Sequence, residues 1–137
     1  MTERPVTFGL NKLVRDKLPD MMRELGQEPE VTRLETKAHV RELIAKVIEE
    51  AQELDPNDPK YLNELADLKQ VISDLIELSG VPDEVERLRQ EDLAKRGGFL
   101  TGQYIGALHL PHDDPWIGYY RKDPKRFPEI ESETKQQ

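Results

Sequence analysis

Two pairs of carboxylates on two successive helices constrain this chain more than any other feature of its sequence. Glu50 and Glu53 form one pair, Glu64 and Asp67 form the other, and the members of each pair are three residues apart. Residues at that spacing lie on one face of a helix, one turn apart. Residues 54–59 are rich in Asp, Asn and Pro and break the helical pattern, which lets the second helix fold back antiparallel to the first. We therefore expect the four carboxylates to face one another.

Apolar periodicity predicts the extent of these helices. Apolar residues recur at helical spacing over residues 37–54, which predicts a long amphipathic helix there. Asp58 suits the N-cap and Pro59 the first position of a second long helix over residues 59–79. A third helix, with a weaker pattern, is expected over residues 82–95.

The remaining segments are less regular. Residues 30–35 alternate with β-branched side chains, and residues 99–110 are apolar but interrupted by glycines, so we predict a short β element in which these two segments pair. Residues 111–137 are rich in Pro and aromatic residues without periodicity and are expected to form an irregular C-terminal arm. The predicted fold class is all-α, an antiparallel helical bundle with this short β element, in a single domain covering residues 1–137.

Composition limits the class of protein further. A content of 36% hydrophobic and 35% charged residues indicates helices with wide solvated faces, or a small core that a partner subunit completes. Val71 and Leu78 lie off the main apolar stripe of the second long helix, so we predict a homodimer or tetramer.

The absence of cysteine excludes disulfides and thiolate metal sites. No apolar run approaches the length of a membrane span and no signal-peptide pattern is present, so we expect a cytoplasmic protein without a membrane partner.

The net charge of −8 is concentrated in the predicted helices. Residues 42–92 carry 15 acidic and 5 basic side chains, whereas the segments on either side are close to neutral. This distribution argues against a nucleic-acid polymer as partner, because its phosphates would be repelled. Most of these acidic residues are expected to form solvated helix faces. An acidic protein still binds a phosphate compound when metal ions bridge the two.

The four paired carboxylates are the predicted metal ligands. Carboxylates that converge on one spot repel each other unless a cation lies between them. A hard divalent cation with oxygen ligands is the natural solution, and Mg²⁺ is the usual choice where phosphates are the substrate, with Mn²⁺ as an alternative. Glu49 lies nearly opposite the apolar stripe of its helix and is expected to face solvent, a second metal ion or another subunit.

Two basic motifs are candidates for phosphate binding. Lys12, Arg15 and Lys17 lie within six positions, interleaved with apolar residues, and Arg96 precedes two glycines. An arginine suits phosphate because its planar group of donors can hold two oxygens. The alternative for the first motif is a set of salt bridges to the acidic helices. The alternative for the second is a helix end with one glycine in the left-handed region.

Taken as a set, these motifs resemble the all-α NTP pyrophosphatase superfamily, which includes MazG-like proteins, dimeric dUTPases and phosphoribosyl-ATP pyrophosphohydrolases. The resemblance is to the MazG-like branch, described as predicted house-cleaning NTP pyrophosphatases, and covers residues 10–100. The motifs that carry it are Asn11-Lys-Leu-Val-Arg-Asp-Lys17, Glu50-x-x-Glu53, Glu64-Leu-Ala-Asp67 and Arg96-Gly-Gly-Phe99.

The resemblance implies a reaction. A nucleoside triphosphate would be cleaved between its α- and β-phosphates to give a nucleoside monophosphate and pyrophosphate, with Mg²⁺ held by the four paired carboxylates. Glu49 and Glu50 would be the catalytic residues, Glu49 as acceptor of a proton from water, and Lys12, Arg15, Lys17 and Arg96 would contact phosphates. Three alternatives remain: phosphoribosyl-ATP hydrolysis, a non-catalytic helical module for dimerisation or regulation, and an acidic metal buffer without turnover.

Overall fold

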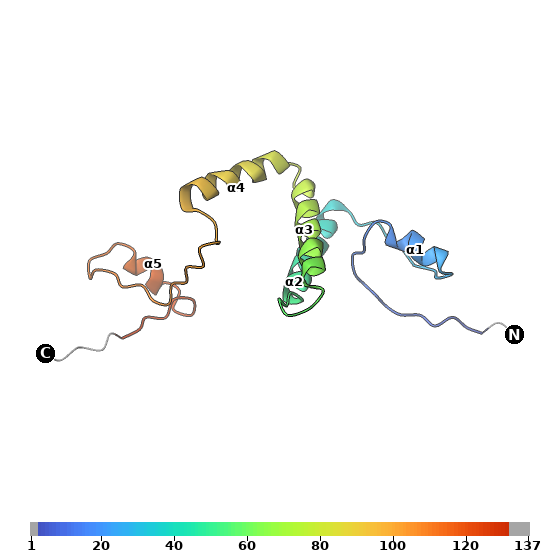
Figure 1. The fold of residues 1–137 in the computed structure, drawn as a ribbon, viewed down its shortest axis with the longest axis horizontal. Coiled ribbons are helices and arrows are strands. Elements are labelled where there is room, and N and C mark those ends of the chain that lie inside the picture. The colour runs from blue at the N-terminus through green and yellow to red at the C-terminus, as the bar shows by residue number, and fades with distance from the viewer. Residues whose placement is uncertain (1–2, 132–137) are drawn as a thin grey trace. The chain divides into compact units, whose positions relative to one another are not determined.

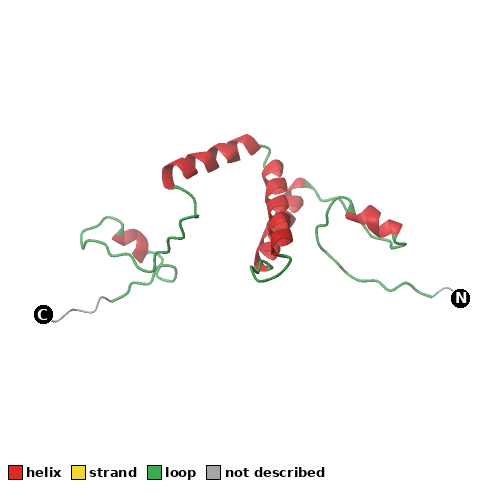
Figure 2. Ribbon diagram, in the orientation of Figure 1, coloured by secondary structure: helices red, strands yellow, loops and turns green. Residues whose placement is uncertain are grey.

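The structure, a computed structural model, describes residues 3–131, and all regular secondary structure in this range is helical (Figures 1 and 2). Its helices are α1 (Leu18–Glu24), α2 (Thr36–Gln52), α3 (Tyr61–Leu78), α4 (Pro82–Arg96) and α5 (Ile117–Arg121). The described residues contain no strand, so the predicted all-α class is confirmed at that level. The chain divides into two compact units, Met1–Gly97 and Gly98–Gln137.

The first unit is built on a hairpin of α2 and α3, which pack against each other along their length (Figure 1). Leu43 on α2 and Val71 on α3 are the buried residues of the described chain, with 4% and 6% of their surface exposed. Burying two such side chains completely is worth only about 3–6 kcal/mol relative to exposure. The hairpin that carries the predicted acidic site therefore has a small core, and larger bundle packing is not confirmed.

Helix boundaries differ from the sequence-based expectation by one or two residues. α2 begins at Thr36 and ends at Gln52, and α3 begins at Tyr61 rather than at Pro59. Asp58 is not the N-cap: its Oδ1 accepts a hydrogen bond from the backbone N–H of Lys60 at 2.8 Å, in the turn that precedes the helix. An aspartate commonly bonds the backbone two residues further on, and this local bond competes with the helical one.

The face of α3 that packs on α2 also differs from the expected one. Val71, expected off the main stripe, is one of the two buried residues. Leu62 and Ile72, expected on the inner face, are exposed, with 75% of the Leu62 surface open. The period of a helix places apolar residues on a stripe but does not decide which edge of a broad stripe meets the neighbouring helix.

The predicted β element is not confirmed. Residues 30–35 and 99–110 form no strand in the structure. Val31 and Leu34, the apolar side chains of the first segment, are exposed. A strand is stabilised by a paired neighbour and a buried face, and alternation in so short a segment supplies neither.

α4 is a solvated helix held by ion pairs along its own surface. Arg87 bonds Glu84 and Glu91, and Arg89 bonds Glu86. These arginine hydrogen bonds hold the pKa of Glu84 and of Glu86 below the ordinary value of a glutamate. The helix ends at Arg96 with Gly97 as its C-cap residue, so a helix end lies at the Arg96-Gly-Gly motif. The φ of Gly97 is 80°, which favours glycine, but its ψ of −180° is not that of a left-handed helical cap.

The second unit contains α5 and a cluster of aromatic rings. Trp116 and Tyr119 meet edge to face with ring centres 5.4 Å apart, and Tyr120 meets Phe127 in the same way at 5.0 Å. Such pairs contribute about 0.5–1.5 kcal/mol beyond their buried area. The predicted irregular arm thus includes a short helix in its described part, while residues 132–137 lie outside the described residues.

No helix in the described range 3–131 is both long enough and apolar enough to cross a membrane.

Candidate functional site

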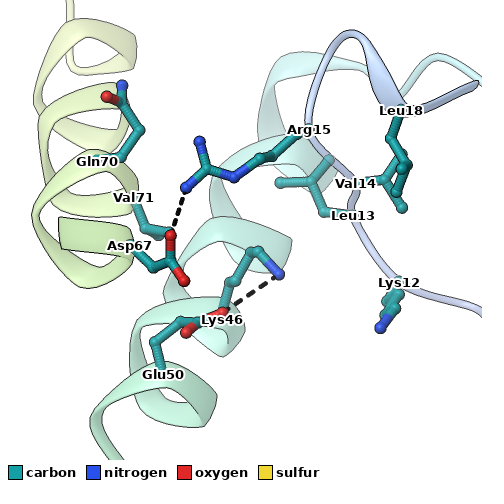
Figure 3. A pocket seen from close by; sticks show the side chains of 10 residues that line it. All are labelled: Lys12, Leu13, Val14, Arg15, Leu18, Lys46, Glu50, Asp67, Gln70 and Val71. Atoms are coloured by element: carbon teal, nitrogen blue, oxygen red, sulfur yellow. Dashed lines mark hydrogen bonds and ion pairs between the residues drawn. The ribbon is translucent and has the colours of Figure 1, made fainter. Parts of the chain in front are cut away.

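A cavity of about 230 Å³ lies in the first unit, where the segment before α1 meets the α2–α3 hairpin (Figure 3). Its wall includes apolar side chains, among them Val71 from the small core of the hairpin. Its charged lining residues are Lys12, Arg15, Lys46, Glu50 and Asp67. One carboxylate of each predicted pair and two of the predicted phosphate contacts therefore line the same space.

Arg15 makes the contact that joins the basic motif to the acidic hairpin. Its Nη2 donates a hydrogen bond to Oδ1 of Asp67 at 2.7 Å, between residues 52 positions apart in the sequence (Figure 3). Both side chains are exposed enough for solvent to reach the pair. An exposed pair of this kind contributes about 0–1 kcal/mol to stability. The contact orients the segment before α1 but does not hold it firmly.

Lys46 and Glu50 form a second ion pair in the cavity, on one face of α2. The Lys46 Nζ lies 3.7 Å from Oε1 of Glu50, and these side chains are only 21% and 12% exposed (Figure 3). Residues four apart on a helix are neighbours on its surface, which explains the contact. The distance is too long for a hydrogen bond, so the interaction is a Coulombic one between two largely buried charges.

Glu49 lies in a neighbouring cavity of about 190 Å³. This second cavity shares Lys12, Leu13 and Lys46 with the first and adds Glu42 on the α2 side. Glu49 itself is exposed, in agreement with its expected position away from the apolar stripe. The two glutamates predicted to be catalytic thus line adjacent cavities, and the side chain of Lys46 borders both.

The four predicted metal ligands are not gathered in one place. Across residues 3–131, no three acidic or histidine side chains are grouped so that they could hold a metal ion. Glu50 and Asp67 share the cavity, while Glu53 is the exposed C-cap residue of α2. Glu64 lies in the first turn of α3, and its Oε2 is buried without a hydrogen-bond partner among the described residues. A buried carboxylate oxygen without a donor is costly, and a cation would satisfy it.

The other two predicted phosphate contacts lie outside both cavities. Lys17 is the exposed N-cap residue of α1. Arg96 is exposed in the last turn of α4 and contacts Asp92 of the same helix at 3.0 Å. Their roles toward a ligand stay predictions.

Lys46 is the charged residue of the site that the sequence reasoning missed. It precedes Glu50 by four positions, so the signal was present: a lysine at that spacing shares the face of the glutamate. Gln70 of α3 also lines the cavity and was not predicted, and its side-chain amide bonds Asp74 at 3.0 Å.

Comparisons of the chain with protein-family models, with curated proteins and with solved structures gave no match. The functional argument therefore depends on the residues themselves. The cavity offers carboxylate oxygens to a cation and lysine and arginine donors to an anion, which is the mixed lining that a metal-bound phosphate compound requires.

Proposed function

We propose that the protein is a Mg²⁺-dependent nucleoside triphosphate pyrophosphohydrolase that clears non-canonical nucleotides, as the likeness to MazG-like proteins implies. One observation carries the proposal: the acidic pairs and the basic motif, far apart in the sequence, supply side chains to one cavity. Asp67 and Arg15 are in direct contact there, and Glu50 and Lys12 line the same cavity from different segments (Figure 3). The carboxylates alone would repel the phosphates of a nucleotide, so they need a metal ion or the basic side chains beside them.

The residues that would hold Mg²⁺, or Mn²⁺ in its place, are Glu50, Glu53, Glu64 and Asp67. All four offer hard oxygen donors, and among the described residues the buried oxygen of Glu64 has no hydrogen-bond partner. Only Glu50 and Asp67 line the cavity, so Glu53 and Glu64 would have to approach them. When bound, the metal would neutralise phosphate charge and lower the pKa of a water. Glu50 is paired with Lys46 and Asp67 with Arg15, so the lysine and arginine side chains have to move when the metal binds.

The chain's own side chains would carry the remaining parts of the reaction. Arg15 and Lys12 would hold phosphate oxygens, with Lys17 and Arg96 as further contacts. Attack of a water oxygen on the α-phosphorus would form one P–O bond and break the bond to the α–β bridging oxygen. Pyrophosphate would leave and a nucleoside monophosphate would remain. Glu49, in the adjacent cavity, would accept the proton of the water.

The experiment that tests the function is a panel of canonical and modified ribo- and deoxyribonucleoside triphosphates, assayed with Mg²⁺ or Mn²⁺ in water enriched in ¹⁸O. We expect pyrophosphate to be released from at least one substrate and the label to appear in the monophosphate, because the α-phosphorus is attacked. Label in the pyrophosphate would instead indicate attack at the β-phosphorus. Release of orthophosphate alone, or no turnover anywhere in the panel, would contradict the proposal.

A second candidate is a non-catalytic helical module for dimerisation or regulation. It is favoured by the separation of the four carboxylates, which are not grouped as a metal site in the described residues. It predicts weak metal binding and no pyrophosphate from any nucleotide. Phosphoribosyl-ATP hydrolysis ranks lower, because the Lys-Leu-Val-Arg-Asp-Lys segment is not characteristic of those enzymes, and the panel with phosphoribosyl-ATP added separates the two.

We also propose that the hairpin associates with a second copy of the chain. Ile44 and Ile48 of α2 and Leu62 and Ile72 of α3 are exposed, and Ile44 and Ile48 are one turn apart on the same face. Adjacent exposed apolar residues of this kind mark interaction surfaces when they form a patch.

Sedimentation at micromolar concentration is expected to show a dimer or tetramer, and Ile48→Glu is expected to shift it toward monomer by placing a charge in the contact. Lys69→Glu, at an exposed polar position of α3, is the control and should leave the distribution unchanged. A monodisperse wild-type monomer would rule out the association.

A further inference from the structure

The first cavity carries the opposite charge from its surroundings. Its lining has three cationic side chains, Lys12, Arg15 and Lys46, against two carboxylates, Glu50 and Asp67. Residues 42–92, which include most of α2 and all of α3, are otherwise strongly acidic. A free divalent cation that enters this cavity meets a net positive lining, although the carboxylates that would bind it are present.

Each carboxylate of the cavity already has a cation beside it. Arg15 contacts Asp67 at 2.7 Å, and Lys46 lies 3.7 Å from Glu50. The second pair is the more protected, since 12% of the Glu50 side chain and 21% of the Lys46 side chain are exposed. A metal that binds through Glu50 or Asp67 has to displace these cations, and displacing them without giving them another anion leaves charges unpaired.

We propose that Lys46 and Arg15 are exchangeable counter-ions, so that the site takes up a divalent metal together with a polyphosphate rather than alone. The lysine and arginine leave the carboxylates when the metal arrives and contact the phosphate oxygens that arrive with it. The identity of that polyphosphate as a nucleotide rests on the proposed function. Lys46 is thereby a binding residue of the site, beyond the basic motif of Lys12 and Arg15.

The position of Lys46 suits this exchange. Its side chain borders both cavities, so a rotation away from Glu50 moves the ammonium group without moving the helix. Lysine is suited to this role because its three donors sit on a flexible stem. A metal–polyphosphate complex is negatively charged as a whole, which matches the positive excess of the cavity, whereas the free metal does not.

Two titrations separate this proposal from a merely structural ion pair. The probes are free Mn²⁺ and the preformed Mn²⁺ complex of inorganic tripolyphosphate, which carries the phosphate chain without a base. Each is titrated into the full chain by calorimetry, with free Mn²⁺ also followed by electron paramagnetic resonance. The variants are Lys46→Met and Lys46→Arg, with Lys69→Met as a control that removes the same charge from an exposed position of α3 outside the cavities.

The expected signature is a change of opposite sign for the two probes. Wild type should bind the complex more tightly than free Mn²⁺. Lys46→Met should bind free Mn²⁺ about two- to five-fold more tightly, because the competing cation is gone. The same variant should bind the complex about ten-fold more weakly, because a charge-assisted phosphate contact is lost. Lys46→Arg should stay near wild type, and Lys69→Met should change neither affinity by more than about two-fold.

The proposal is overturned if Lys46→Met, with a circular dichroism spectrum that matches wild type, changes both affinities in the same direction. It is equally overturned if this variant changes neither affinity. It is also overturned if wild type binds free Mn²⁺ as tightly as the complex, or binds neither. Opposite-sign changes without any nucleotide turnover would contradict the proposed function but support this inference. Nucleotide turnover without opposite-sign changes would support the proposed function but contradict this inference.

Discussion

Replacing Glu50 by Gln is expected to reduce Mg²⁺-dependent pyrophosphate release by about 100-fold or more, since even the outer-shell partners of metal ligands are worth 10–100-fold. The amide keeps the shape of the side chain but removes the charge that attracts the metal. Asp67→Asn should have a similar effect from the facing helix. Both residues line the cavity, so the loss follows from the site and not from a distant change in packing.

Folding should survive these two substitutions. In the described residues Glu50 pairs with Lys46 at 3.7 Å, and Asp67 contacts Arg15 in an exposed pair. The circular dichroism spectra should therefore match wild type and the unfolding midpoint of Asp67→Asn should stay close to it, whereas Glu50→Gln should lower the midpoint because it leaves the largely buried Lys46 without its partner. Glu77→Gln, at an exposed position of α3, is the matched control for loss of an acidic charge. Full turnover by either Glu50→Gln or Asp67→Asn would show that the metal ligands are assigned wrongly.

Leu43→Ala is expected to lower the free energy of unfolding of the hairpin by about 2–5 kcal/mol, the usual cost of truncating a buried leucine. Leu43 is 4% exposed and shares the core with Val71, so little other packing compensates for the cavity left behind. Against a typical total of about 5–15 kcal/mol for a folded domain, this change is large. Urea denaturation followed by circular dichroism measures it.

The neighbouring residue supplies the control. Ile44 is 46% exposed, so Ile44→Ala should cost less than Leu43→Ala. If the two substitutions cost the same and the difference from wild type depends on protein concentration, Ile44 is covered by a second copy of the chain. If they cost the same at every concentration, the assignment of the core to Leu43 is wrong.

Local patterns in the sequence predicted the helices well, because helix formation depends on neighbours three and four positions apart. Apolar periodicity over residues 37–54 predicted α2 to within two residues, and the predicted end of the second long helix at residue 79 lies one residue beyond the end of α3 at Leu78. The start of α3 was missed because Asp58 bonds the turn instead of the helix. The β element was predicted from alternation alone, without evidence for the paired neighbour that a strand needs.

The sequence predicted which residues belong to the candidate site, but it did not predict how they contact one another. The sequence identified Glu50, Asp67, Lys12 and Arg15 by residue type and spacing, and these four line one cavity. The contact of Arg15 with Asp67 is one of the salt bridges to the acidic helices that the sequence offered as an alternative, but the sequence could not identify the partners, because 52 residues separate them and no local rule links their positions. It also gave Lys46 no role, although its spacing from Glu50 was visible.

The sequence by itself determined the positions of the long helices α2, α3 and α4 and which of their faces carry charge, since both follow from short-range periodicity. Only the tertiary structure decided that Val71, rather than Leu62 or Ile72, is buried on α3, because burial depends on how α2 meets the helix. It also decided that Arg15 neutralises Asp67 in the cavity and that, among the described residues, Oε2 of Glu64 has no hydrogen-bond partner. Such pairings depend on distances between side chains of different segments, and those distances are fixed by packing and not by order along the chain.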